Sequence, residues 1–501
     1  MRFVPFAMSA GTPRRISAGT VSNEPAPASV FTIPAASPAT TNKPVPVRSR
    51  VIRRPTARKS ATCKAALVKW QRPTTQPGGV GQSVFCAARG SGALERSRRQ
   101  AFGCGRGARR TWPSPACLFA GTDVREKAQT KIARWPMSVR GAVLYNFFEP
   151  LKVESVKLRA PRPDEVVVKM AASGVCHSDL SVQQAKLPFP PPVILGHEGA
   201  GIVEEVGKEV TGLKLGDHVV LAWVQSCGRC AYCIEGEEHL CDAAIKAMMA
   251  GEETAFEKDG MAISRMAGVG SFAERTLVRA SACIKIPEEV PLDKACLVGC
   301  GVMTGVGAVT NTAKVRPGQT VAVFGCGGVG LNVIQGAVLC GAGRIIAVDL
   351  VEKKLQWARE FGATDTINAK QTTDVPDAIR SLTEGRGVDF AFEVIGMPEV
   401  IGQAFLSLRR GGKVVVVGVP GFDQTVQLPA SAIPLEEKSV LGSLYGSARM
   451  RRDMPKLLEL YMQKRLKLDE LISRRISLDQ VNEAFAAMES GEVARSVIVY
   501  S

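Results

Sequence analysis

The chain has 501 residues, of which 45% are hydrophobic and 22% are charged, so it is long enough for about two or three domains with buried cores. These proportions exclude a collagen-like chain and a chain that is disordered throughout. The net charge is +17, but residues 1–137 carry 24 Lys and Arg against 4 Asp and Glu, whereas residues 138–501 carry 40 against 43. The body of the chain is therefore almost neutral, which argues against a basic groove for nucleic acid.

Residues 1–137 form an extension of unusual composition, with 14 of the 30 prolines and almost no acidic residues. Such a segment buries too little apolar surface to offset the entropy of ordering, so we expect it to be disordered. An N-terminus rich in Arg and Ser and poor in acids is typical of organelle transit peptides, which predicts a plastid or mitochondrial location. Two alternatives remain: an extension that is not used in the cell, with a cytoplasmic chain starting at Met137, and an arm that binds nucleic acid.

Strand-like runs dominate the first part of the body. They are rich in β-branched residues and are separated by Gly and Pro. We expect strands at 139–145, 165–175, 199–207 and 217–223. This pattern indicates an all-β or α+β unit.

The pattern changes near residue 300 to alternating strands and helices. We expect apolar strands at 320–325, 344–349, 389–396 and 412–419, and helices at 331–342 and 352–362. Continuous apolar strands that alternate with helices predict an α/β fold with a doubly wound parallel sheet. A helix at 450–466 and a strand at 495–500 then return the chain to the first unit. The uncharged stretches are dense in Gly and break into strands and helices, so no membrane span is expected.

A glycine-rich motif, Gly325-Cys-Gly327-Gly328-Val329-Gly330, follows the first of these strands and opens the first helix. It matches G-x-G-x-x-G, whose glycines let backbone N–H groups approach a pyrophosphate at a helix N-terminus. Asp349 ends the next strand, 19 residues after Gly330. Its carboxylate can accept hydrogen bonds from ribose hydroxyls and would repel a 2′-phosphate, so the motif predicts NAD rather than NADP.

Four cysteines lie within 15 residues, with the spacing Cys-x2-Cys-x2-Cys-x7-Cys; they are Cys227, Cys230, Cys233 and Cys241. A disulfide framework is usual in short secreted chains, but this chain is long and shows no secretory signal. Four thiolates fill the tetrahedral shell of zinc, so the spacing predicts a structural zinc site.

A second group of metal-ligating residues is dispersed along the chain. Cys176, His197 and Cys300 each stand in a distinctive local string. Three such ligands would leave the fourth zinc position open, as in catalytic sites. Spacing alone does not show that they meet, and the histidines His177, His218 and His239 compete for the role.

Residues 138–501 closely resemble the zinc-containing medium-chain alcohol dehydrogenases. The run from Gly196 to Val210, the four cysteines, the string around Cys300 and the glycine motif follow that family's order. The resemblance implies a GroES-like catalytic domain at 138–301, a Rossmann NAD-binding domain at 302–444 and a return to the catalytic domain at 445–501. It also implies two zinc ions per chain, NAD, a small alcohol or aldehyde substrate, and a homodimer or homotetramer joined through the Rossmann sheets.

The resemblance also assigns roles residue by residue. It implies that Cys176, His197 and Cys300 bind the catalytic zinc and that Glu198 lies beside it. Asp179 would orient the His197 ring, and Ser178 would hydrogen-bond the substrate oxygen. The cofactor-binding residues would be Gly325, Gly327, Gly328, Val329, Gly330, Asp349, Lys354, His177, Thr304 and Arg495.

The sequence departs from the family at a few positions. Ser181 stands where many members have a histidine at the solvent end of a proton relay. Leu187 and Ile245 stand where glutathione-dependent formaldehyde dehydrogenases carry an acidic residue and an arginine. These departures weigh against a glutathione adduct, and the apolar segments 188–193 and 302–303 favour an apolar primary alcohol.

The expected function is hydride transfer between a primary alcohol or aldehyde and NAD(H). The first alternative is a thiol-dependent formaldehyde dehydrogenase of the S-(hydroxymethyl)glutathione dehydrogenase type. A zinc-free quinone or enoyl reductase of the same superfamily is a second, which the seven candidate zinc ligands disfavour. The third is an organellar RNA-associated protein that acts through the basic extension.

Overall fold

A computed structural model of the chain describes residues 135–250 and 254–501. Our expectations for the N-terminal extension, namely disorder, import into an organelle and nucleic-acid binding, concern residues 1–137 and so fall almost wholly outside the described residues. The described body contains three β-sheets, and its parallel sheet is the one that the sequence predicts.

The first sheet is a closed barrel of short strands around a core of aliphatic and aromatic side chains. Its strands, in barrel order, are β1 (Met137–Leu144), β2 (Lys152–Leu158), β7 (Phe256–Lys258), β8 (Met261–Arg265) and β4 (Val193–Ile194).

The second sheet joins distant parts of the chain. Its strands are, in order, β10 (Cys283–Lys285), β6 (His218–Leu221), β5 (Glu198–Val206), β3 (Glu165–Val175), β18 (Arg495–Val499) and β17 (Ile472–Ile476), with β9 (Arg275–Arg279) also paired to β3. Ser496 of β18 pairs with Val175 of β3 in an antiparallel ladder. This pairing brings the start of β18 to the end of β3, next to Cys176.

The third sheet is entirely parallel, in the order β13 (Asp365–Asn368), β12 (Arg344–Asp349), β11 (Thr320–Phe324), β14 (Val388–Glu393), β15 (Leu408–Val416) and β16 (Ser439–Gly442). This strand order is that of a doubly wound dinucleotide-binding sheet. The α/β prediction is therefore confirmed.

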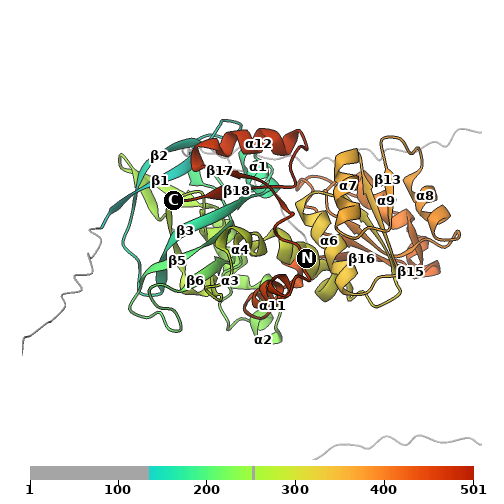
Figure 1. The fold of residues 1–501 in the computed structure, drawn as a ribbon, viewed down its shortest axis with the longest axis horizontal. Coiled ribbons are helices and arrows are strands. Elements are labelled where there is room, and N and C mark those ends of the chain that lie inside the picture. The colour runs from blue at the N-terminus through green and yellow to red at the C-terminus, as the bar shows by residue number, and fades with distance from the viewer. Residues whose placement is uncertain (1–134, 251–253) are drawn as a thin grey trace, which may run out of the picture. The chain divides into compact units, whose positions relative to one another are not determined.

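Helices cover both faces of the parallel sheet because successive strand residues point to opposite sides. Val321 and Val323 pack in one core with α6 (Gly328–Leu339) and α7 (Glu352–Glu360), whereas Ala322 and Phe324 pack in another with α8 (Val375–Leu382) and α9 (Pro398–Leu406). Figure 1 shows these two helix pairs beside the strands.

Shorter elements connect the sheets. The remaining α-helices are α1 (His177–Gln183), α2 (Ala231–Glu235), α3 (Asp242–Ala250), α4 (Leu292–Ala295), α5 (Gly301–Gly307), α10 (Ala432–Leu435), α11 (Met450–Met462) and α12 (Val481–Glu489). Single turns of 3₁₀-helix are η1 (Glu238–Leu240), η2 (Met266–Gly268), η3 (Ala280–Ala282), η4 (Cys296–Gly299), η6 (Tyr445–Ser447) and η7 (Leu478–Gln480), and η5 (Ala308–Ala313) is a π-helix.

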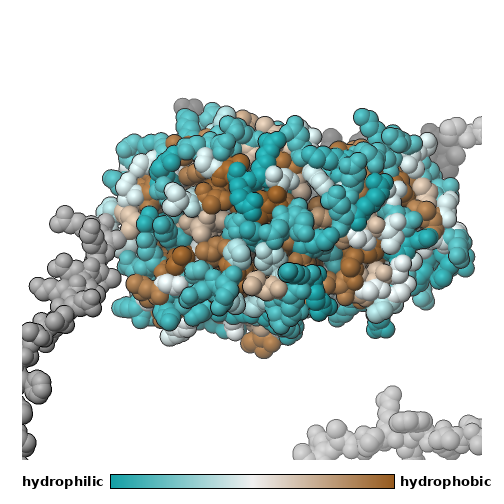
Figure 2. Space-filling model, in the orientation of Figure 1, coloured by the Kyte–Doolittle hydropathy of each residue, from teal (hydrophilic) through white to brown (hydrophobic). Residues whose placement is uncertain are grey.

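No single helix within the described ranges is both long and apolar enough to cross a membrane; only the bent pair Leu292–Gly299 and Gly301–Ala313, at 54° to each other, meets those criteria when taken together. The molecular face in Figure 2 is mostly hydrophilic, with apolar residues in small groups. One such group lies at α2, where Tyr232 and Ile234 are exposed.

Candidate active site

Three elements bring Cys176, His197, Glu198 and Cys300 together. Cys176 follows β3 and caps α1, His197 directly precedes β5 and Glu198 begins it, and Cys300 separates η4 from α5. Their ligand atoms all lie within 4.8 Å of one another, and all four residues are buried. The three dispersed ligands of the sequence analysis therefore converge, although more than 100 residues separate His197 from Cys300.

Asp179 organises this cluster. Its Oδ1 lies 3.0 Å from Nδ1 of His197 and accepts the backbone N–H of Gly196 at 3.0 Å, while its Oδ2 accepts the N–H of Cys176 at 2.9 Å. With Nδ1 committed, Nε2 of His197 is buried and has no hydrogen-bond partner among the described residues. A buried nitrogen lone pair beside two thiols is the donor set of a soft-ligand metal site.

The electrostatics of the cluster favour a thiolate. The hydrogen bond with the Cys300 thiol, helped by the charge of Arg495, lowers the pKa of Cys176 well below its usual value despite burial. The same hydrogen bond raises the pKa of Cys300. Burial alone would lower the pKa of His197, but the charges of Asp179 and Cys176 outweigh it and raise that pKa well above its usual value. A bound cation would displace these protons and take over their charge.

Glu198 and Arg495 form a buried ion pair next to the cluster, with 3.2 Å between Oε1 and a guanidinium nitrogen. Gly174 leaves room for this carboxylate, because a Cβ there would overlap Oε2 of Glu198. Burial raises the pKa of Glu198 to about 7, although Arg495 opposes the shift. Arg495 is the first residue of β18, so the pairing of β18 with β3 brings it to this cluster.

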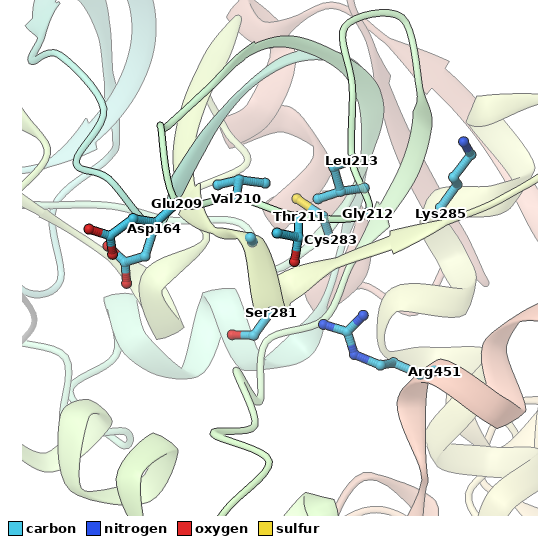
Figure 3. Close-up of a pocket in the computed structure, with 11 residues that line it drawn as sticks. Asp164, Glu209, Val210, Thr211, Gly212, Leu213, Ser281, Cys283, Lys285 and Arg451 are labelled. Carbon is cyan, nitrogen blue, oxygen red and sulfur yellow. The ribbon is translucent and has the colours of Figure 1, made fainter.

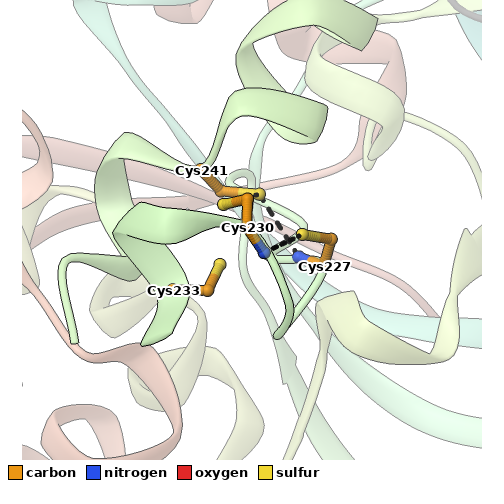
Figure 4. A group of neighbouring side chains, drawn as sticks. All are labelled: Cys227, Cys230, Cys233 and Cys241. Carbon is orange, nitrogen blue, oxygen red and sulfur yellow. Dashed lines mark hydrogen bonds between the residues drawn. The ribbon is translucent and has the colours of Figure 1, made fainter. Parts of the chain in front are cut away.

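The four clustered cysteines also come together, in a loop around α2 (Figure 4). The N–H of Cys227 donates to Sγ of Cys241 at 3.3 Å, and the N–H of Cys230 donates to Sγ of Cys227 at 3.4 Å. None of the ten cysteines within the described ranges is in a disulfide. Backbone N–H donors that point at sulfur stabilise thiolates, as a metal site requires.

The pKa values of two thiols in this loop shift in opposite directions. The N–H groups of Arg229 and Cys230 lower the pKa of Cys227 to about 6. Burial and the neighbouring thiol of Cys230 raise the pKa of Cys233 to about 12. Four neighbouring thiols do not all lose their protons by themselves, because the thiolate charges repel one another. A divalent cation compensates these charges, so the four residues fit zinc.

The glycine motif forms the turn between β11 and α6. Gly325 has a φ of +97°, which favours glycine. A Cβ on Gly330 would overlap the carbonyl oxygen of Gly325, so this glycine permits the close approach of helix and strand. A Cβ added at Gly327 would have no other atom within 4 Å, so this position faces open space. A Cβ on Gly328 would lie 2.6 Å from Nε of Arg495. The free N–H groups of the α6 N-terminus and this guanidinium suit an anion such as a pyrophosphate.

Asp349 lies at the end of β12, beside this turn. Its Oδ2 accepts the N–H of Cys326 at 2.7 Å and its Oδ1 accepts the N–H of Val351 at 3.0 Å. A carboxylate has about four acceptor positions, so lone pairs remain for a ligand. Lys354 lies on α7, and a Cβ on Gly491 would be 3.5 Å from its Nζ.

The other predicted residues are placed as follows. Val329 lies in the first turn of α6 and Thr304 lies in α5. His177 and Ser178 open α1, and Oγ of Ser178 lies 3.8 Å from Sγ of Cys176. The competing histidines His177, His218 and His239 belong to neither metal-ligating group of the described residues.

Sequence reasoning missed two aromatic residues near the cluster, Trp223 and Tyr445. Their ring centroids are 4.3 Å apart, and the Tyr445 hydroxyl donates to the carbonyl of Gly299, which precedes Cys300. Neither residue belongs to a motif. Trp223 ends the strand expected at 217–223 and Tyr445 begins the segment expected to return to the first unit, and neither position by itself indicates a contact with the cluster.

A pocket of about 260 Å³ lies elsewhere in the described part of the chain and is lined by none of these residues. Figure 3 shows Arg451 of α11 reaching toward it, with Lys285 of β10 at one edge and Asp164 and Glu209 on the opposite side. Its mixed charge and its separate lining distinguish it from the metal cluster.

Comparison with known proteins agrees with this architecture. The family model described as "Alcohol dehydrogenase GroES-like domain" matches residues 162–288, and that described as "Zinc-binding dehydrogenase" matches residues 328–463.

The chain is also similar over its body to characterised proteins. An NDMA-dependent alcohol dehydrogenase from Amycolatopsis methanolica is 38% identical, and an S-(hydroxymethyl)glutathione dehydrogenase from Synechocystis is 39% identical; each alignment covers 73% of this chain and 100% of the relative. The crystal structure of benzyl alcohol dehydrogenase from Acinetobacter calcoaceticus is 35% identical with a TM-score of 0.69, covering 73% of this chain and 99% of that one.

Proposed function

The chain belongs to the zinc-containing alcohol dehydrogenase family, and we propose that it transfers a hydride between a primary alcohol or its aldehyde and NAD(H) at a zinc ion. Membership of the family makes the protein an oxidoreductase of the alcohol dehydrogenase type. The observation that carries the finer proposal is the convergence of Cys176, His197 and Cys300, with Nε2 of His197 buried and unpartnered within the described residues.

Zinc suits this donor set, because two thiolates and an imidazole are ligands that it prefers and three protein ligands leave one position open. The chemistry supplied by bound zinc and NAD is Lewis acidity toward an alcohol or carbonyl oxygen and a nicotinamide ring that exchanges hydride. Asp179 holds the His197 ring with Nε2 facing the thiols. The burial of all the ligands excludes water from the reacting atoms.

Ser178 is the group that we propose for proton transfer. Its Oγ lies 3.8 Å from Sγ of Cys176, so it stands beside the ligands that would bind the metal. A hydroxyl both donates and accepts hydrogen bonds, so Ser178 can accept the proton of a substrate alcohol and pass one on toward solvent. His177, the exposed neighbour at the start of α1, lies on the solvent side of this path.

NAD is the proposed cofactor. The open space at Gly327 and the guanidinium of Arg495 support pyrophosphate binding. The carboxylate of Asp349 retains lone pairs for the ribose hydroxyls and would repel a 2′-phosphate. Because the Amycolatopsis relative is named an NDMA-dependent alcohol dehydrogenase, NDMA should be tested as a second electron acceptor.

The proposed substrate is an apolar primary alcohol. Leu187 and Phe189, in the segment that follows α1, pack against the apolar core of the barrel. Val302 and Met303, which follow Cys300, are buried apolar residues. Val302 and Met303 thus offer apolar contacts beside a proposed ligand, and none of these four side chains carries a charge to bind a polar substrate group.

A second candidate is the oxidation of a glutathione adduct of formaldehyde, which is favoured by the 39% identity to the Synechocystis relative. Against it, Leu187 and Ile245 are both apolar and half-buried. They provide no ion pair for the charged groups of glutathione. We therefore place this reaction second.

A substrate screen that follows NADH absorbance tests the proposal. Aliphatic and aromatic primary alcohols should be oxidised with NAD, and the Cys176→Ser variant should be inactive. Oxidation of formaldehyde only after glutathione is added would favour the second candidate. Turnover with NADP alone, or a Cys176→Ser variant as active as the wild type, would contradict the proposal.

We also propose a homo-oligomer formed through β16. This strand is the edge of the parallel sheet, and its exposed Val440 alternates with half-buried neighbours. Nearby segments expose Val419, Phe422 and Leu435. An exposed apolar edge strand favours pairing with the edge strand of another molecule. In a second copy of the chain, β16 is such a strand.

A further inference from the structure

The helical segment that carries Cys300 is broken at that residue. The segments Leu292–Gly299 and Gly301–Ala313 meet at 54°, and Cys300 has φ and ψ of −145° and −74°, outside helical and strand values. A helix that ends leaves carbonyls without intrahelical partners, and a helix that begins leaves N–H groups without them. Gly299 and Gly301, on either side of the break, are both buried, so water does not satisfy these groups.

Two side chains from distant parts of the sequence fill these positions. Oε1 of Glu198 accepts the N–H of Gly301 at 3.1 Å, and the hydroxyl of Tyr445 donates to the carbonyl oxygen of Gly299. Cys300 is therefore held on both sides by hydrogen bonds that its own helix cannot supply. Glu198 already belongs to the cluster, whereas nothing so far assigns a role to Tyr445.

Tyr445 is itself tightly constrained. It is fully buried, with 1% of its surface exposed, and its ring lies against Trp223. The connector that carries it, η6, packs with its backbone against α5: a Cβ on Gly446 would lie 2.8 Å from Cα of Gly307. A phenol on so rigid a support fixes the position of the carbonyl that it contacts.

We propose that Tyr445 is a positioning residue for Cys300, and that its hydroxyl holds the Gly299 carbonyl so that the Cys300 thiolate is aimed at the metal. This inference rests on the proposed function, in which Cys300 binds the catalytic zinc. The ring of Tyr445 contributes to packing, but a phenylalanine would supply the same ring. The hydroxyl is therefore the group that separates positioning from packing.

The test is Tyr445→Phe, with Tyr461→Phe as the matched control. Tyr461 lies on α11, and its hydroxyl donates to exposed Asp469 at 2.9 Å. Both changes remove one phenol oxygen, but only the first leaves a buried carbonyl without its donor. Each variant is loaded with Co²⁺ at the catalytic site, and the thiolate–cobalt absorption and the rate of metal loss to a chelator are recorded. A Cys300→Ser variant identifies which absorption band and which kinetic phase belong to this site.

We expect Tyr445→Phe to shift the cobalt absorption and to release the catalytic metal about tenfold faster, in the range found when groups that support metal ligands are removed. Tyr461→Phe should match the wild type. Tyr445→Leu removes the ring as well as the hydroxyl. This variant should release the metal at a rate similar to that of Tyr445→Phe and should also have a lower thermal stability.

Unchanged cobalt absorption and metal release in folded Tyr445→Phe would overturn the inference while leaving the proposed function intact. A Cys300→Ser variant that binds metal as the wild type does would instead overturn the metal site itself, and the inference with it. The two failures are therefore distinguishable.

Discussion

Oδ1 of Asp179 lies 3.0 Å from Nδ1 of His197 and also accepts the N–H of Gly196, the residue before that histidine. One carboxylate thus fixes both the ring and the backbone that carries it. Its second oxygen accepts the N–H of Cys176, so two proposed metal ligands depend on the same side chain.

This arrangement predicts the effect of Asp179→Asn. An amide has one acceptor oxygen where the carboxylate has two, so one of the three N–H donors loses its partner. We expect the affinity for the catalytic metal to fall about 10–100-fold and the free energy of unfolding to fall by about 1–3 kcal/mol. Equilibrium dialysis against a competing chelator measures the first effect, and urea unfolding measures the second.

Asp217→Asn is the matched control. Asp217 is also buried and accepts a backbone N–H, that of Lys214 at 3.0 Å, but it contacts no proposed ligand. The Asp217→Asn variant should have a lower free energy of unfolding but an unchanged affinity for the catalytic metal. Equal losses of metal in both variants would show that Asp179 acts only through stability.

Metal content is the second prediction. The purified protein should hold about two zinc ions per chain, because the two groups of ligands are separate. Cys227→Ser should chiefly reduce folding yield and thermal stability, whereas Cys176→Ser should remain folded with one zinc ion fewer and no turnover. Elemental analysis with circular dichroism decides this, and active enzyme with a single zinc ion would refute it.

Local patterns predicted much of the fold because the corresponding elements are decided locally. The strands 165–175 and 344–349 were expected with the bounds that the structure has, since each is rich in apolar and β-branched residues. Helix α6 begins at Gly328, three residues before the expected start, because the glycine motif forms the first helical turn as well as the loop.

The candidate site could be predicted only in part. The four clustered cysteines, Cys227, Cys230, Cys233 and Cys241, are close in sequence, so their spacing alone indicated a common site. Cys176 and Cys300 are brought together by the packing of β3, β5 and η4, which no spacing encodes. Tyr445 was missed because its role arises from a break in another helix, and its contact with Gly299 spans 146 residues.

Cofactor preference is the third prediction. Asp349→Gly should weaken NAD binding by about 1.5–3 kcal/mol, the value of a hydrogen bond to a charged group, and should admit NADP. Because Asp349 also accepts the N–H of Cys326, Asp349→Asn separates the loss of charge from the loss of that contact. Values of kcat/KM for both cofactors measure the change. A wild-type preference for NADP would contradict our placement of this carboxylate.

Oligomer formation is the fourth prediction. A charge on the edge of a sheet opposes strand pairing, so Val440→Glu on β16 should convert the oligomer to smaller species in analytical ultracentrifugation. Thr366→Glu, on the opposite edge strand β13, is the control and should leave the assembly unchanged. Equal sedimentation of Val440→Glu and the wild type would exclude β16 as the interface.

The last prediction concerns stability in acid. Oδ2 of Asp389 accepts the N–H and the hydroxyl of Thr320 at 2.8 and 2.7 Å, and its Oδ1 accepts Nε of Arg409 at 2.8 Å. This carboxylate therefore joins β14 to the starts of β11 and β15. Burial would raise the pKa of Asp389, but these hydrogen bonds and the charge of Arg409 outweigh it and lower the pKa below its usual value.

A lowered pKa in the folded state means that the ionised carboxylate stabilises the fold at a pH above the unfolded value of about 3.9 and that this contribution is lost as the pH falls through the folded value. Asp389→Asn should therefore lower the free energy of unfolding by about 1–3 kcal/mol near pH 7, and its deficit relative to the wild type should shrink below about pH 4. Comparing the two proteins in urea at each pH cancels any acid-induced metal loss that they share. Asp377→Asn, at an exposed pair with Arg380, should stay within about 0.5 kcal/mol of the wild type. A deficit for Asp389→Asn that is constant down to pH 3 would mean that the carboxylate's charge plays no part in joining these strands.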